Sequence, residues 1–238
     1  MDYVLSFKIV FTGDSGCGKS SLVKRYEHNC KLPDDTFAFD KYATSTIGVD
    51  YVSIRRPYTL DDGDTCDIKL SIWDTGGQER YNSICKVYYK DISAAIVVFD
   101  ITNHESFLNI KKWIDNIIFI NQNDELLYVI IGNKCDLKED NIYNDTNKDY
   151  LFECNKLLAD YKINYIYFET SVKDNTNING CFEEIIHKLF NVFITKHNIK
   201  GALKDIHKVQ IDNFSDANNG INVFKVDRSI GNHKSGCG

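Results

Sequence analysis

Residues 13–20 have the sequence Gly13-Asp14-Ser15-Gly16-Cys17-Gly18-Lys19-Ser20, which matches the pattern G-x-x-x-x-G-K-[ST]. An apolar run at 3–11 precedes this stretch, and a helical pattern at 20–30 follows it. Glycines allow the backbone to wrap closely around phosphate oxygens, and the N–H groups of such a loop and of the following helix point toward them. The stretch therefore predicts a loop that binds the phosphates of a nucleoside triphosphate. It does not indicate which base.

Two side chains of this loop have predicted roles. Lys19 is expected to reach the β- and γ-phosphates and to assist catalysis, and the Ser20 hydroxyl is expected to coordinate Mg²⁺. The other residues of the segment that we expect to contact the nucleotide are Ser15, Gly16, Cys17, Gly18 and Ser21. A glycine-rich turn with a surface lysine is the alternative, and the agreement of strand, loop and helix makes it the weaker one.

Short apolar runs alternate with helical patterns over most of the chain. The expected strands are 3–11, 51–56, 68–73, 93–100, 126–132 and 163–168, and the expected helices are 20–30, 104–120, 149–160 and 178–193. Strands that are apolar on both faces and separated by helices are typical of a mostly parallel sheet covered on both sides. The pair within 51–73, joined by a turn at 61–64, is the expected antiparallel exception. We therefore expect an α/β fold in one domain, 1–197.

The composition is that of a globular protein followed by a tail. Of 238 residues, 43% are hydrophobic and 26% charged, which argues against a disordered, collagenous or coiled-coil chain. The last part, 198–238, is rich in Asn, Asp, Gly, Lys and Ser without a sustained period, and we expect it to be flexible. The net charge of −6 disfavours a protein that neutralises DNA phosphates, so no nucleic-acid partner is expected.

Cysteine usage and hydropathy bear on the compartment. Eight cysteines occur without a C-x-x-C pair, and the start of the chain shows no signal-peptide pattern, so we expect reduced thiols in the cytosol. No apolar stretch has the length that a bilayer span needs. Any membrane attachment is therefore expected to use something other than a helix.

A second motif, Trp73-Asp74-Thr75-Gly76-Gly77-Gln78-Glu79, ends an expected strand. Asp74 can hold Mg²⁺ through water, the Gly77 N–H can point toward the γ-phosphate, and Gln78 can orient a water for in-line attack. Asp-x-x-Gly alone is common. Its position after a phosphate-binding loop makes the functional interpretation the stronger one.

A threonine precedes the expected strand 51–56, in Ser45-Thr46-Ile47-Gly48. Thr46 can give its hydroxyl to Mg²⁺ and its N–H to the γ-phosphate. A threonine in this position is more often only a strand-edge residue, so the neighbouring motifs alone make it a ligand candidate.

The third motif, Asn133-Lys134-Cys135-Asp136, follows the expected strand 126–132, at the carboxyl end where a parallel sheet meets its ligand. The Asp136 carboxylate can accept hydrogen bonds from guanine N1–H and from the 2-amino group, which adenine lacks, so GTP is favoured. The Lys134 stem can lie along the base plane, and Asn133 belongs to the same candidate set. After strand 163–168, Ser171-Val172-Lys173 can offer a backbone N–H to the guanine carbonyl.

With these motifs in this order, the chain resembles the Ras-like small GTPases and, within them, the Rab branch. The Rab-like stretches are 47–51, 69–81, 87–90 and 97–102, and the likeness covers 5–195. The resemblance implies a six-stranded sheet with one antiparallel edge, about five helices, bound GTP or GDP with Mg²⁺, and slow GTP hydrolysis. It also implies a switch in vesicle traffic on the cytosolic face of intracellular membranes, cycling with the cytosol.

The resemblance also implies partners. Tyr51, Trp73 and Tyr88 would present a surface to effectors, with core packing as the alternative for Trp73. An exchange factor is expected, and so is an activating protein that supplies an arginine, because no arginine of the chain occupies a decisive position. The alternatives are a GTP-binding interaction module with impaired hydrolysis, a Ran-like soluble transport GTPase, and a kinase of small metabolites. The third motif and Gln78 disfavour the kinase.

The chain departs from the family pattern in three places. The spacing from Lys19 to Thr46 is several residues longer than usual, which leaves the guanine-stacking aromatic open between Phe37 and Phe39, with Phe39 favoured. Gly76 stands where the family usually has Ala, which is expected to loosen the loop and change the hydrolysis rate. Cys237 is single where Rab tails usually carry two prenylated cysteines, so one lipid there would anchor only marginally, and an unmodified thiol is the alternative.

Overall fold

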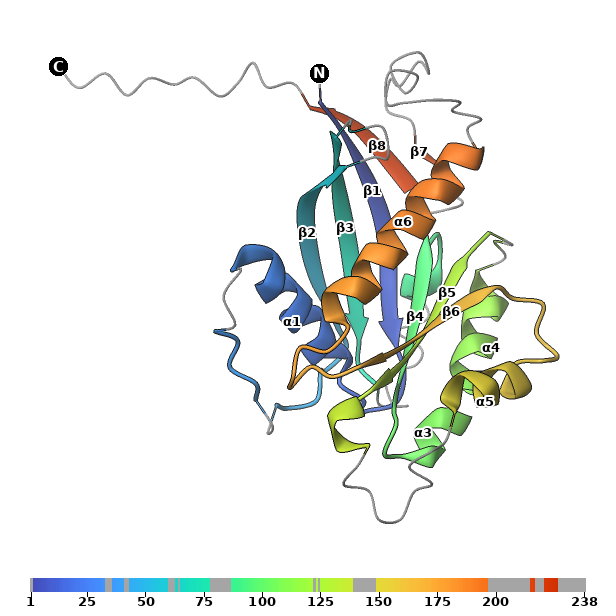
Figure 1. The fold of residues 1–238 in the computed structure, drawn as a ribbon. Coiled ribbons are helices and arrows are strands. Elements are labelled where there is room, and N and C mark those ends of the chain that lie inside the picture. The colour runs from blue at the N-terminus through green and yellow to red at the C-terminus, as the bar shows by residue number, and fades with distance from the viewer. Residues whose placement is uncertain are drawn as a thin grey trace.

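The computed structural model describes residues 2–32, 36–40, 43–59, 63, 65–77, 87–121, 123, 125–138, 149–196, 215–216 and 221–226. A central sheet has the strand order β2-β3-β1-β4-β5-β6 (Figure 1). The strands are β1 (Asp2–Thr12), β2 (Val49–Thr59), β3 (Thr65–Thr75), β4 (Ala94–Asp100), β5 (Leu127–Asn133) and β6 (Tyr165–Thr170). Only the β2–β3 pair in this series is antiparallel, which confirms the predicted α/β sheet with one antiparallel edge.

Helices cover both faces of the sheet (Figure 1). The helices are α1 (Lys19–Lys31), α3 (His104–Leu108), α4 (Ile110–Ile120), α5 (Tyr150–Leu157) and α6 (Ile178–Lys196), with 3₁₀ turns at Val87–Tyr89 and Cys135–Leu137. One buried apolar cluster joins the sheet to α1 and α6, and a second joins its other face to α4 and α5. All seven residues of β4 are buried, as expected for a central parallel strand.

The segment 104–120, expected as one helix, is two helices. The break falls at Asn109, whose backbone has φ −70° and ψ −7°. Its side chain donates a hydrogen bond to Asp14 of the phosphate-binding loop. A polar side chain with a tertiary partner of this kind interrupts a helix that apolar periodicity alone predicts as continuous.

The tail also differs from the expectation at two segments. Ser215–Asp216 forms β7, and Ile221–Val226 forms β8, which pairs antiparallel with β1 from Asp2 opposite Val226 to Phe7 opposite Ile221. Because β4 pairs with β1 only from Ile9 onward, the first half of β1 has an open edge that a strand can occupy. The isolated apolar residues of 221–226 therefore belong to a strand.

The described helices include none that is both long and apolar enough to cross a membrane. The six cysteines in the described part of the chain, Cys17, Cys30, Cys66, Cys135, Cys154 and Cys181, are free thiols. Burial raises the pKa of the Cys17 thiol, which disfavours its reactive thiolate.

Candidate functional site

A cavity of about 710 Å³ lies beside the carboxyl ends of the parallel strands. It brings together segments that are far apart in the sequence. The predicted site residues that line it are Ser15, Gly16, Gly18, Lys19, Ser20, Ser21, Phe39, Thr46, Gly77, Asn133, Lys134, Asp136, Val172 and Lys173. Cys17, Asp74 and Ser171 are buried and are not among the lining residues, although their chain neighbours are. Gln78 and Cys237 lie outside the described residues.

The phosphate-binding loop is packed tightly against the strands beneath it. A Cβ atom at Gly13 would lie 2.1 Å from the backbone oxygen of Val98, and one at Gly18 would lie 2.3 Å from the Asn133 side chain. Both glycines also have a positive φ, so this backbone path requires residues without a side chain. Lys19 is buried, and its Nζ donates hydrogen bonds of 2.8 Å to the carbonyl oxygens of Gly13 and Asp14. The loop therefore curves around the Lys19 ammonium.

Three oxygen-bearing side chains gather at the phosphate end of the cavity. The Ser20 and Thr46 hydroxyl oxygens are 2.5 Å apart. Asp74 is 3% exposed, and its Oδ1 makes no hydrogen bond within the described structure. Burial raises the pKa of Asp74, and the Ser20 hydroxyl and Lys19 act against that shift. Hydroxyl and carboxylate oxygens are the ligands that Mg²⁺ prefers, and a buried carboxylate oxygen without a donor fits a cation, so these residues suit magnesium.

Two consecutive glycines place the end of β3 against other loops. The Gly76 N–H donates a 2.7 Å hydrogen bond to the carbonyl oxygen of Gly48, and a Cβ at Gly76 would lie 2.6 Å from the Thr46 carbonyl oxygen. A Cβ at Gly77 would lie 2.4 Å from the peptide between Asp14 and Ser15. Gly76, which was expected to loosen this loop, therefore permits a close backbone contact with residues 46–48.

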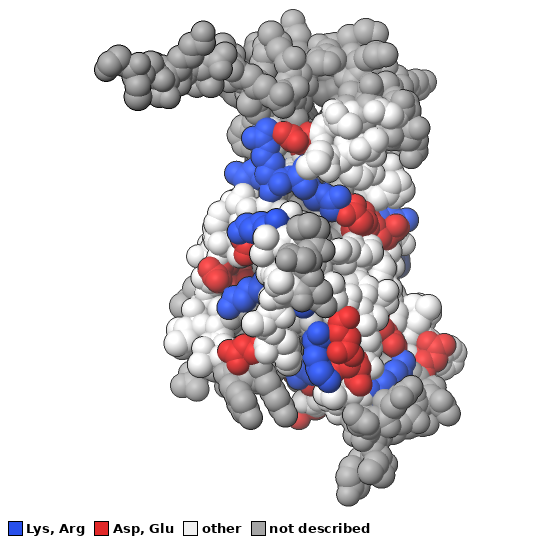
Figure 2. Space-filling view, turned by 60° about the vertical axis from the view of Figure 1, so that its left-hand side comes forward, with Lys and Arg blue, Asp and Glu red and all other residues white. Residues whose placement is uncertain are grey.

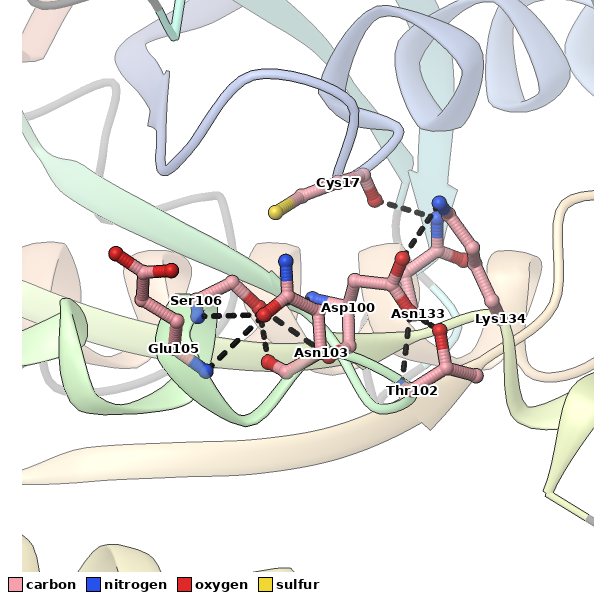
Figure 3. A network of polar contacts seen from close by, with 8 residues as sticks. All are labelled: Cys17, Asp100, Thr102, Asn103, Glu105, Ser106, Asn133 and Lys134. Carbon is pink, nitrogen blue, oxygen red and sulfur yellow. Dashed lines mark hydrogen bonds and ion pairs between the residues drawn. The ribbon is translucent and has the colours of Figure 1, made fainter. Parts of the chain in front are cut away.

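Asn133 joins the base end of the cavity to the phosphate loop (Figure 3). Its Nδ2 donates to the carbonyl oxygen of Cys17 over 2.9 Å, and its Oδ1 accepts from the Thr170 hydroxyl over 3.2 Å. Asn133 is 2% exposed. The Asn133 amide thus links β5 to both β6 and the phosphate loop. The motif alone did not predict this bridging role.

Asp136 and Lys134 are each fixed by a neighbour. Asp136 accepts a 2.6 Å hydrogen bond from the Ser171 hydroxyl, and its other oxygen is 3.8 Å from Lys173 Nζ. Lys134 has a positive φ, and its ammonium forms a 2.6 Å ion pair with Asp100 at the end of β4 (Figure 3). Ser171 therefore positions the carboxylate through its side chain, in addition to the backbone contact predicted for it.

A comparison with known protein families agrees with this geometry. The model of the Ras family matches residues 8–191. The chain belongs to the Ras family. It is a small GTPase, an enzyme that binds guanine nucleotide and hydrolyses GTP.

Similar proteins identify the branch within the Ras family. Ras-related protein RIC1 of rice (Oryza sativa subsp. japonica) is 40% identical over 191 residues, covering 80% of this chain and 83% of RIC1. Ras-related protein RABD2a of Arabidopsis thaliana is 40% identical over 181 residues, covering 76% of this chain and 78% of RABD2a. Ras-related protein Rab11B of Nicotiana tabacum is 33% identical over 195 residues, covering 82% and 80%. The chain is a Rab-like small GTPase.

The two candidate stacking aromatics of this GTPase differ in their surroundings. Phe37 lies 4.7 Å from the Arg25 guanidinium and makes an edge contact with His28, 5.4 Å between ring centroids. Phe39 is 43% exposed. Both line the cavity, but Phe37 is packed against α1, and Phe39 is the more exposed of the two.

The structure brings the three predicted aromatic residues of the Rab-like GTPase together. The ring of Trp73 lies 4.8 Å from that of Tyr51 and 4.7 Å from that of Tyr88. Tyr51 is 45% exposed, and Trp73 is half-buried against the second apolar cluster. Trp73 thus contributes to packing and also joins an exposed aromatic surface.

Sequence reasoning missed several residues of the site. Lys24 lines the cavity one helical turn after Ser20, a spacing that helical periodicity can reveal. Asp100 and Asp14, which fix Lys134 and the phosphate loop, gave no local signal because their partners are distant in sequence. Other lining residues, for which the sequence analysis predicted no role, are Ala38, Asp40, Ala43, Thr44, Ser45, Thr75 and Leu137.

Proposed function

We propose that this Rab-like GTPase is a GTP/GDP switch in membrane traffic that hydrolyses GTP slowly unless an activating protein assists. The observation that carries the proposal is the cavity shared by Lys19, Thr46 and Asp136. These residues come from the phosphate loop, the segment before β2 and the turn after β5. One guanine nucleotide can contact all three at once, with its phosphates at Lys19 and its base at Asp136.

Asp136 is the proposed base reader. Ser171 donates to one of its oxygens, which fixes the carboxylate without neutralising it. The carboxylate retains lone pairs for the guanine N1–H and 2-amino donors. Lys134, Val172 and Lys173 line the same end, and Phe39 is the proposed stacking ring.

At the other end, Ser20, Thr46 and Asp74 are the proposed holders of Mg²⁺. The bound cation would neutralise charge on the phosphates. Lys19 places its ammonium beside the loop, where the β- and γ-phosphates would lie, and the Gly77 N–H is available to the γ-phosphate. Gln78, next in the chain, is the proposed group that orients the attacking water.

Switching follows from the loops that meet at the γ-phosphate end. A GTP γ-phosphate adds contacts to Thr46 and Gly77, and its loss on hydrolysis removes them. The exposed apolar residues beside these loops are Ile47, Tyr51 and Val87, at 78%, 45% and 72% exposure. We assign effectors and regulators to this surface, which contains the Tyr51–Trp73–Tyr88 cluster, because its shape depends on the loops that sense the γ-phosphate.

Charge does not single out another partner surface on the face drawn in Figure 2. Lys and Arg side chains form a run in the upper part of that face with Asp and Glu side chains beside it, and the two signs lie side by side in the lower part. Elsewhere in the fold, opposite charges also pair directly, as Arg55 does with Asp67 between β2 and β3 and Arg56 does with Glu183. Mixed charge of this kind favours the apolar cluster as the specific contact.

Membrane association is proposed through Cys237, with the protein cycling between cytosol and the cytosolic face of intracellular membranes. A single lipid gives only marginal binding, so this attachment would be reversible. Mass spectrometry of cell-derived protein tests it: a prenyl mass on Cys237 is expected, and an unmodified thiol would contradict the anchor.

Calorimetry on nucleotide-stripped protein with Mg²⁺ tests the nucleotide assignment. GTP and GDP should bind far more tightly than ATP, because only guanine satisfies Asp136 with two donors. Equal affinity for ATP and GTP, or binding of neither, would overturn the proposal.

Gln78→Leu tests the hydrolytic step. Turnover stimulated by an activating protein should fall by orders of magnitude, since the water loses its orienting group while an arginine alone cannot place it. Nucleotide affinity is the control and should stay near the wild-type value. Stimulated turnover equal to wild type would remove Gln78 from the mechanism. No stimulated turnover in the wild type itself would favour the interaction-module alternative.

A further inference from the structure

The side chain of Asp14, inside the phosphate loop, is held from outside that loop. Asn109 Nδ2 donates to Asp14 Oδ2 over 2.7 Å, and Trp113 Nε1 donates to Asp14 Oδ1 over 2.8 Å. Each carboxylate oxygen therefore has a donor from the α3–α4 region. Hydrogen bonds to a charged acceptor are stronger and more directional than neutral ones, so this contact fixes the position of the loop.

The two donors are themselves well fixed. Trp113 is 2% exposed within the second apolar cluster. Asn109 occupies the junction between α3 and α4, where its N–H donates to the Glu105 carbonyl and its carbonyl accepts from the Trp113 N–H. The loop is thus tied to a helix, α4, that is absent from the described lining of the nucleotide cavity.

The backbone of Asp14 meets a different part of the site. Its carbonyl oxygen accepts from Lys19 Nζ, and its peptide bond to Ser15 is the surface on which Gly77 lies. A single added methyl at Gly77 would approach that peptide to 2.4 Å, so the two backbones are already in contact. A displacement of the Asp14–Ser15 peptide toward Gly77 would therefore push Gly77 as well.

We propose that Asp14 is a positioning residue that couples α4 to the γ-phosphate loop. Asn109 and Trp113 fix the position of the Asp14 carboxylate, which fixes the Asp14–Ser15 peptide. That peptide in turn fixes the position of the Gly77 N–H. This inference rests on the proposed function, in which the Gly77 N–H contacts the γ-phosphate. GTP has that phosphate and GDP lacks it, so the coupling should act on GTP affinity more than on GDP affinity.

The test exchanges the hydrogen-bonding partners. Asn109→Asp places two carboxylates against each other and removes the donor to Asp14. The double variant Asp14→Asn with Asn109→Asp restores both contacts. In it, the amide introduced at position 14 donates to the carboxylate introduced at position 109, and the oxygen of that amide still accepts from Trp113. Asp14→Asn alone is the matched control, since the Asn109 amide can rotate to accept from it.

The measurements are calorimetric affinities of the full chain for GDP and for a non-hydrolysable GTP analogue, with Mg²⁺, and thermal unfolding of each variant. Asn109→Asp should lower the GTP-to-GDP affinity ratio by about fivefold, the size of one lost hydrogen bond. The double variant should recover the ratio. Trp113→Phe, which keeps an aromatic ring but loses the N–H, should lower the ratio to a similar extent.

Two results would overturn the coupling: an unchanged GTP-to-GDP affinity ratio in Asn109→Asp, even if both affinities fall equally, or a double variant that regains thermal stability but not the ratio. Failure of the underlying function gives a different result, because the wild type itself would then show no preference for guanine nucleotides.

Discussion

The two ends of the nucleotide cavity are built differently. At the base end, Asn133 bonds to the phosphate loop and to β6, and Ser171 fixes Asp136, all at the carboxyl ends of β5 and β6. At the γ-phosphate end, Thr46 meets Ser20 through a hydroxyl contact, and its neighbour Gly48 accepts a backbone hydrogen bond from Gly76. A densely bonded end retains the nucleotide, while an end formed by loops can respond to a single phosphate. In the proposed function, nucleotide affinity and switching therefore depend on different ends of the cavity.

The largest effect is expected from the base end itself. Asp136→Asn replaces the anionic acceptor with a group whose N–H₂ meets the guanine donors, so GTP affinity should fall on the order of 100-fold, about 3 kcal/mol. Xanthosine triphosphate should bind in its place. Calorimetry measures both, with the exposed Asp160→Ala as control. Unchanged GTP affinity would show that Asp136 does not contact the base.

Asn133→Ala tests whether the base end acts as a rigid unit. The substitution removes a buried amide that bridges Cys17 and Thr170, at a cost of about 2 kcal/mol. GDP and GTP should weaken equally, by about 30-fold at that cost, and thermal stability should fall. A loss confined to GTP would contradict the assigned division between the two ends.

Thr46→Ala tests whether the γ-phosphate end distinguishes GTP from GDP. Loss of one hydroxyl should weaken the GTP analogue about tenfold and leave GDP affinity nearly unchanged, because only the triphosphate state uses this residue fully. The neighbouring Ile47→Ala is the matched control, since Ile47 is exposed and should affect partner binding alone. Equal weakening of both nucleotides by Thr46→Ala would place the residue outside the switch.

The smallest effect is expected from Gly76→Ala, which installs the usual family residue. Its Cβ would lie 2.6 Å from the Thr46 carbonyl oxygen, so residues 46–48 must move by a fraction of an ångström or more. Amide hydrogen exchange in 44–48 should accelerate a few-fold in the GDP state, as the Gly76–Gly48 bond weakens. Unchanged exchange would show that this contact does not hold the segment.

The local motifs of the chain made much of this structure predictable. The phosphate loop, the strand periodicities and Asn133 to Asp136 each carry their signal within a few residues, and the structure gathers them at one cavity. The break at Asn109, the strand β8 and the bridging role of Asn133 depend on partners that are remote in sequence. Those partners are Asp14 for Asn109, the open edge of β1 for β8, and the Cys17 carbonyl for Asn133. The spacing of apolar residues cannot predict contacts of this kind.

The antiparallel course of β8 fixes the position of Val226, the last residue that the structure describes. β1 runs from Asp2 toward the nucleotide cavity, and β8 runs back, so Val226 lies beside Asp2 at the far end of the sheet (Figure 1). The proposed lipid on Cys237 would therefore attach the protein through the end of the sheet that lies opposite the nucleotide cavity. The nucleotide entrance would then face away from the bilayer, toward regulators arriving from solution.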